Sequence, residues 1–105
     1  MSYNVTFKGQ FVYPNTPAVL EALKVIDEEA ADPDMEEMNA LEKEDFKLLE
    51  EETTLEIDFS ASIPATCWYG CQRVLYKMST HAINGKIRCQ FQGDPAQYIV
   101  AGDGY

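Results

Sequence analysis

The sequence predicts a single α+β domain in which two strand–helix–strand halves share one antiparallel sheet, with the helices on one face. Two stretches of alternating apolar and polar residues, at 3–13 and 53–63, predict strands. A proline and an apolar helical pattern follow each stretch, and the two stretches match each other at an offset of 50 residues. The length of 105 residues fits one domain, residues 1–105.

The first half begins with a strand whose apolar side chains fall on one face if Gly9 keeps the register. These side chains are Tyr3, Val5, Phe7, Phe11 and Tyr13. A helix is expected next, with Thr16 as its cap and Pro17 as its first residue, because proline loses no hydrogen bond there. The apolar stripe of this helix consists of Val19, Ala22, Leu23, Ile26 and Ala30.

An acidic insertion is predicted at about 32–50, and its pattern fits either a helix or a loop. Within it, residues 46–50 fit either a short strand or a continued helix, because periodicity does not separate the two for so short a run.

The second half repeats the order of the first. Residues 53–63 alternate cleanly, which predicts a strand with one face exposed to water. Its apolar side chains are Leu55, Ile57, Phe59, Ala61 and Ile63. A helix is expected from about Thr66 to Ala82, with Thr66 as its cap. A turn at Asn84–Gly85 and a second turn at 93–95 then separate strands at 86–92 and 97–101.

Five positions carry the match between the halves: Val5 with Leu55, Phe7 with Ile57, Tyr13 with Ile63, Pro14 with Pro64, and Thr16 with Thr66. Two such units with antiparallel pairing make an α/β plait, which resembles the ferredoxin-like arrangement in its layout. The helices match better at an offset of 52, which places Cys71 at the position of Val19 and Leu75 at that of Leu23.

Charge is unevenly distributed along the chain. The formal net charge is −10, and residues 1–58 carry 16 acids against four bases, whereas residues 59–105 carry two acids against four bases. A chain this acidic repels bare nucleic acid, because phosphate binding needs lysine and arginine. It would instead attract a basic protein surface. The alternative is that the charge only keeps the surface solvated.

The stretch 67–71, CWYGC, raises the question of a reactive or metal-binding site. Cys71 is expected in the core, whereas Cys67 lies in the first helical turn, where exposed N–H groups favour a thiolate, and is a candidate reactive thiol. His81 would lie about 21 Å along the helix from Cys67, too far for a catalytic pair. The spacings of Cys67, Cys71, His81 and Cys89 do not fit a zinc site. No metal, cofactor or catalytic residue is predicted.

Two surfaces are candidates for binding a partner. Tyr69, Arg73 and Tyr76 share the outer face of the second helix at positions i, i+4 and i+7, and tyrosine and arginine are enriched in binding hot spots. The alternative is that they only cover the edge of the helix. Residues 27–52 carry 13 acids against two lysines. The acids singled out there are Glu36, Glu37, Glu44 and Asp45.

These observations favour a cytoplasmic, non-enzymatic protein that docks on a basic partner as an inhibitor, immunity-type or regulatory protein, by mimicking nucleic acid if the partner binds it. No signal peptide or membrane segment is expected. One alternative is a small enzyme or ligand-binding domain with a cleft near Cys67 and Trp68. Another is an assembly protein, because residues 97–101 would form an edge strand that can pair with a second copy in a homodimer.

Overall fold

Five antiparallel strands and two α-helices make up the computed structural model, which describes residues 2–31, 41–49 and 53–101. In chain order the elements are β1 (Ser2–Val12), α1 (Thr16–Ala31), the 3₁₀ helix η1 (Lys43–Asp45), β2 (Phe46–Leu49), β3 (Thr54–Pro64), α2 (Ala65–Ser79), β4 (Asn84–Phe91) and β5 (Gln97–Val100).

The sheet has the strand order β2-β3-β1-β4-β5, and every neighbouring pair is antiparallel. The first four strands follow the ferredoxin-like layout, with β1 and β3 in the centre. The chain departs from that layout by a fifth strand, which pairs with β4 at the edge of the sheet. The predicted α+β class, with two strand–helix–strand halves, is therefore confirmed.

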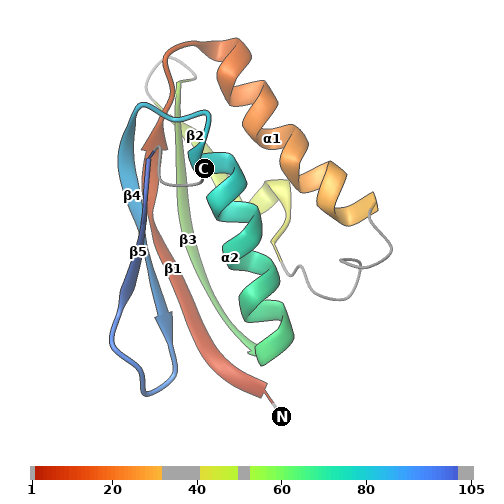
Figure 1. Cartoon of the computed structure of the whole chain (residues 1–105), viewed down its shortest axis with the longest axis vertical. Helices are drawn as coiled ribbons and strands as arrows, with labels where there is room; N and C mark the ends of the chain where they lie inside the picture. Colours follow the sequence, from red (N-terminus) through yellow and green to blue (C-terminus); the bar gives the residue numbers. More distant parts are fainter. Residues whose placement is uncertain (1, 32–40, 50–52, 102–105) are drawn as a thin grey trace.

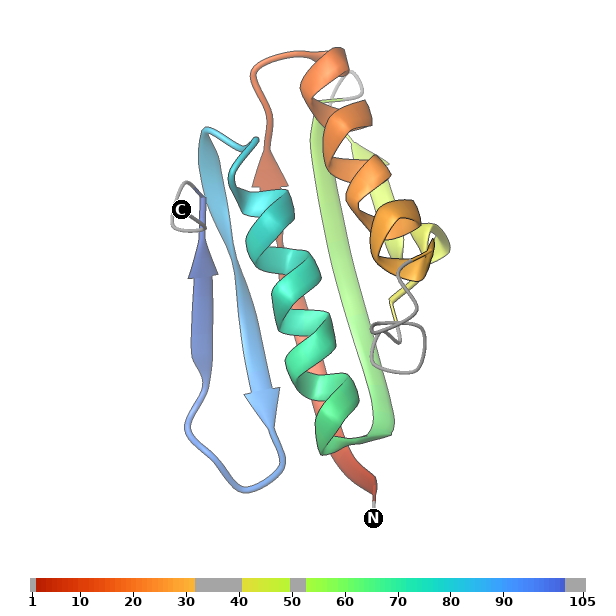
Figure 2. The same ribbon diagram turned by 45° about the vertical axis from the view of Figure 1, so that its right-hand side comes forward.

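Both helices cover the same face of the sheet (Figure 1). When the molecule is turned by 45°, α2 lies over the middle of the sheet and α1 runs beside it on the β3 and β2 side (Figure 2). Helix α2 contacts β1, β3 and β5 as well as α1. The chain thus forms two layers, and its core lies between them.

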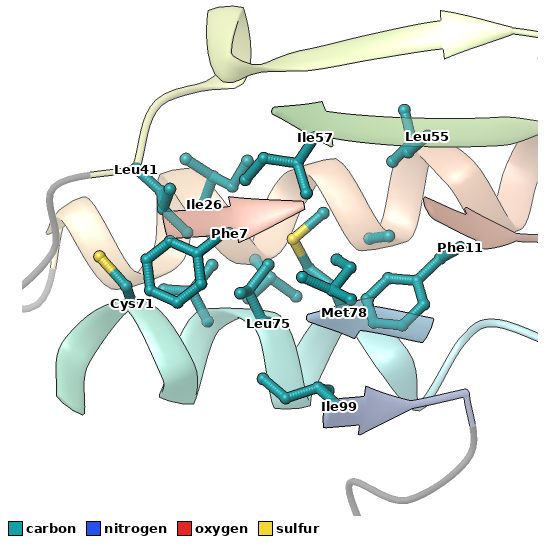
Figure 3. Close-up of a cluster of buried hydrophobic side chains, with 14 of the residues drawn as sticks. Phe7, Phe11, Ile26, Leu41, Leu55, Ile57, Cys71, Leu75, Met78 and Ile99 are labelled. Carbon is teal, nitrogen blue, oxygen red and sulfur yellow. The ribbon is translucent and has the colours of Figure 1, made fainter. Parts of the chain in front are cut away.

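The core contains the inward-facing residues that the strand alternation predicts. In the β1–β3 pair, Phe7 lies opposite Phe59 and Phe11 lies opposite Leu55. Phe7, Phe11 and Leu55 are at most 2% exposed. Labelled side chains from both layers gather in this space (Figure 3): Phe7, Phe11, Ile26, Leu41, Leu55, Ile57, Cys71, Leu75, Met78 and Ile99. Burial of this apolar area is the main source of stability.

Two glycines allow β1 and β4 to approach closely. A Cβ on Gly9, whose φ is 147°, would lie 2.2 Å from the carbonyl oxygen of Lys86. A Cβ on Gly85, whose φ is 101°, would lie 2.3 Å from the carbonyl oxygen of Gln10. Only glycine avoids both the overlap and the backbone strain. Gly9 keeps the register of β1, as predicted.

The helix caps differ from the prediction. Asn15, not Thr16, caps α1, because its Oδ1 accepts the N–H of Ala18 at 2.9 Å. Thr16 is the first residue of α1, ahead of Pro17. Helix α2 begins at Ala65, so Thr66 lies inside it, and Pro64 at the cap position provides no side-chain hydrogen bond. This helix ends at Ser79, three residues earlier than predicted.

The predicted insertion at 32–50 is shorter than expected. Residues 46–49 form β2, which pairs with β3 and is part of the sheet. Residues 43–45 form η1. Residues 41 and 42 belong to no helix or strand, and residues 32–40 and 50 lie outside the described residues. Residues 46–49 form a strand and not a helix because they pair with β3. Local periodicity cannot reveal the hydrogen bonds that this pairing supplies.

Candidate functional site

The outer face of α2 carries the predicted group Tyr69, Arg73 and Tyr76. Tyr69 is 65% exposed and Tyr76 is 41% exposed. Arg73 lies between them in the helical repeat, and its side chain is half exposed. However, the guanidinium of Arg73 already has an intramolecular partner, so part of this group has a structural role.

That partner is Glu29 of α1, a buried acid that was not among the predicted site residues. Its side chain is only 3% exposed and forms ion pairs with Lys77 and Arg73 of α2. Glu29 Oε2 lies 3.5 Å from Arg73 Nε, within ion-pair distance but outside hydrogen-bond geometry. Two cations therefore compensate one buried carboxylate and join the helices. The sequence does carry one signal of this burial. Glu29 lies three residues after Ile26, so it falls on the apolar stripe of α1.

The exposed part of α1 and the neighbouring η1 form a second surface, here called the acidic face. Its charged residues are Glu21, Lys24, Asp27, Glu28, Glu42, Lys43, Glu44 and Asp45. Both lysines are paired within the face, Lys24 with Glu21 at 3.0 Å and Lys43 with Asp27 at 2.6 Å. Six carboxylates thus share two cations, and the face has a negative potential.

Of the four predicted acids, two lie on the acidic face. Glu44 is exposed, whereas Asp45 is half-buried and its Oδ2 accepts the N–H of Glu42 at 2.8 Å. Glu36 and Glu37 lie outside the described residues. Leu20 of α1, which precedes Glu21 in the chain, is 54% exposed. Protein interfaces commonly combine apolar side chains at the centre with a polar rim.

A small cavity opens where the start of α2 faces the β4–β5 turn, and it is here called the aromatic cavity. It has a volume of about 160 Å³ and is lined by Trp68, Tyr69, Gln72, Phe91, Asp94 and Gln97. Trp68 forms part of it, as expected of a cleft near the helix start, but Cys67 does not line it.

The three cysteines occupy different environments, and none of them forms a disulfide. Cys71 and Cys89 are fully buried, as predicted. Burial, and then the nearby Cys71 thiol, raise the pKa of Cys89 to about 12, so this thiol stays protonated at neutral pH. Cys67, the third residue of α2, is half-buried and packs against the core.

The outer face of the sheet carries mainly polar side chains that pair across strands. Lys8 Nζ of β1 lies 3.8 Å from Asp58 Oδ1 of β3, an ion pair across the two central strands. At the β5 edge, Tyr98 and Val100 are 50% and 40% exposed, and Lys86 Nζ lies 4.9 Å above the ring of Tyr98. The predicted edge strand therefore exists, with two apolar side chains beside a lysine.

Comparison with known proteins returns no match for this chain among protein-family models, curated proteins or solved structures. Within residues 2–31, 41–49 and 53–101, no three histidine, cysteine, aspartate or glutamate side chains converge as metal ligands would. Neither α1 nor α2 is long and apolar enough to cross a bilayer.

Proposed function

We propose that the protein is a non-enzymatic binding module whose acidic face docks on a basic surface of a partner protein. The observation that supports the proposal is the excess of six carboxylates over two lysines on the acidic face, where both lysines are already paired. A partner rich in lysine and arginine would find uncompensated carboxylates there, and the exposed Leu20 of α1 would offer an apolar contact.

The charge contributes to binding mainly through the rate of encounter. Complementary potentials raise the association rate and become weaker as salt screens them. Leu20 would then contribute apolar area at short range. This division predicts that binding is strongest at low ionic strength and that Leu20 affects mainly the dissociation rate.

The test is capture of partners from cell extract at about 0.05 M and about 0.5 M salt, followed by kinetic measurements with the purified partner. The variant Glu21→Gln/Glu28→Gln removes two charges from the acidic face. Its matched control, Glu56→Gln/Asp58→Asn, removes two charges from the outer face of the sheet. We expect association about tenfold slower for the first variant and nearly unchanged for the control.

Equal effects of the two variants would contradict docking through the acidic face. Binding that does not change between the two salt concentrations would contradict the electrostatic basis of the proposal. Leu20→Ala adds an independent measurement, because it leaves the charge unchanged.

A second candidate function, homodimeric assembly, is favoured by the exposed Tyr98 and Val100 on the edge strand β5. Two copies related by a two-fold axis would pair β5 with β5 and extend the sheet. Sedimentation at two protein concentrations tests this. Val100→Lys is expected to abolish any dimer, and a monomer at every concentration would exclude the assembly.

A further inference from the structure

We propose that the aromatic cavity is a binding site for an organic ammonium group, either a free quaternary amine or the methylated lysine side chain of a protein. This inference concerns a different surface from the acidic face and does not depend on the function proposed above.

The walls of the cavity are aromatic and held in place. Trp68 is only 5% exposed and stacks on Phe7 with ring centroids 5.3 Å apart at 16°. Phe91 packs against Trp68 at 5.3 Å and 60°. Tyr69, which is largely exposed, completes the wall on the solvent side. Aromatic rings present negative faces to a ligand, and several rings around one hollow attract alkylammonium ions.

The polar groups of the cavity favour the same ligand. Among the described residues that line it, Asp94 is the only charged one, so the lining carries a negative charge and no positive one. The backbone holds Asp94 in the β4–β5 turn, because its N–H donates to Phe91 O at 3.0 Å and its carbonyl accepts from the Gln90 amide. The charge of Asp94 and the negative faces of the rings disfavour an anionic ligand.

Two glutamines supply the remaining lining. Gln72 Nε2 donates to Gln97 Oε1 at 3.1 Å, and this bond joins α2 to β5 across the cavity. An amide has more acceptor sites than this one bond uses, and amide oxygens tolerate a nearby cation. Trp68 is the fourth residue of α2, and Tyr69 and Gln72 lie further along the helix. The positive potential of the helix start is weaker at these positions than at the first residues.

The volume limits the size of the ligand. A cavity of about 150 Å³ accommodates a group the size of benzene. The aromatic cavity, at about 160 Å³, therefore fits a trimethylammonium group but not a nucleotide or a folded peptide segment. A longer molecule would insert only its cationic end and leave the rest in solvent.

Trp68, the only tryptophan of the chain, provides a direct reporter at this site. Choline chloride is titrated at constant ionic strength while the tryptophan emission is recorded. We expect a saturable change with a dissociation constant of about 1 mM. The uncharged isostere 3,3-dimethylbutan-1-ol should give no saturable change. A peptide containing trimethyllysine separates the two sources, because tighter binding of the peptide than of choline indicates a protein side chain and weaker binding indicates a free amine.

The matched variants are Asp94→Asn in the cavity and Asp58→Asn on the outer face of the sheet, which remove the same charge. We expect Asp94→Asn to weaken choline binding about fivefold and Asp58→Asn to leave it unchanged. Tyr69→Ala, at a largely exposed position, should also weaken it about fivefold without loss of the fold, which circular dichroism monitors.

Absence of a saturable change with choline and with the peptide would overturn the proposal. An equal response to the uncharged isostere, or equal effects of Asp94→Asn and Asp58→Asn, would also overturn it.

Discussion

Helices α1 and α2 occupy equivalent places in the two halves of the fold, yet they differ in charge and in burial. Helix α2 contains no acidic residue and buries seven of its residues over the centre of the sheet. Helix α1 contains four acids and one lysine and presents most of its charge to solvent. The equivalent leucines show the difference, because Leu75 of α2 is fully buried whereas Leu23 of α1 is only partly buried.

The two helices therefore have different roles in the repeated halves. Helix α2 supplies the centre of the core, and α1 supplies the acidic face. Glu29 is the exception that connects them, because it is the acid of α1 that turns inward and binds Arg73 and Lys77. The same plait position can thus serve packing in one half and surface charge in the other.

The largest change in the free energy of unfolding is expected when the ion pairs between α1 and α2 lose their two cations, Arg73 and Lys77. The variant Arg73→Ala/Lys77→Ala leaves the buried carboxylate of Glu29 without a partner, and we expect unfolding to become easier by about 3 to 5 kcal/mol. Urea denaturation measures this change. Glu29→Gln should cost only about 1 to 2 kcal/mol, because the half-exposed Arg73 and Lys77 can turn to water. A larger loss for Glu29→Gln than for the double variant would contradict the role assigned to Glu29.

The second prediction compares the equivalent leucines directly. Leu75→Ala creates a cavity at a fully buried position, and we expect a loss of about 3 kcal/mol in the free energy of unfolding. Leu23→Ala is the matched change in α1 and should cost about 1 kcal/mol, since water already reaches part of that side chain. Equal losses in thermal or urea denaturation would show that the two helices contribute equally to the core.

A third comparison concerns how the two helices begin. Asn15→Ala removes the capping oxygen of α1, and we expect a loss of about 1 kcal/mol. Thr66→Ala should change stability by less than about 0.5 kcal/mol, because Thr66 lies inside α2 and is exposed. A larger loss of unfolding free energy for Thr66→Ala than for Asn15→Ala in urea denaturation would support Thr66 as a helix cap, as predicted from the sequence.

The smallest effect at neutral pH concerns the thiols. Cys67 is expected to react with a disulfide reagent in the folded protein, whereas Cys71 and Cys89 should react only after unfolding. If Cys67 reacts no faster than a free thiol, the prediction that Cys67 is a reactive thiol is wrong.

The raised pKa of Cys89 has a consequence at high pH. The folded state holds this proton more tightly than the unfolded state, so the stability it provides is complete below about pH 9 and is lost towards about pH 12. Urea denaturation should therefore show stability falling with pH in this range, and falling less steeply for Cys89→Val.

Much of the fold could be predicted because alternation and helical spacing are local properties. The inward residues of β1 and β3, the core positions of Cys71 and Cys89, and the edge strand 97–101 were all readable from the sequence. Caps were harder, since Asn15, Thr16 and Thr66 all suit an N-terminal position and only backbone geometry selects among them. Strand β2 depended on pairing with β3, which no local pattern records.

Prediction of the candidate sites was less complete, because each depends on contacts between distant segments. Arg73 was visible as part of an exposed group, but its ion pair with Glu29 spans two helices. The aromatic cavity brings Trp68 of α2 next to Phe91 and Asp94 of the β4–β5 region. Neither arrangement has a spacing signature, because its residues are far apart along the chain and only the tertiary fold brings them together.

By itself, the sequence determined which faces of the strands are apolar, the order of the elements other than β2, and the acidic character of the first half, because these follow from residue type and local periodicity. The tertiary structure decided which acid is buried, which cations compensate it and where a cavity opens. The physical reason is that burial and pairing of charged groups depend on packing between α1, α2 and the sheet, and packing is a property of the whole fold.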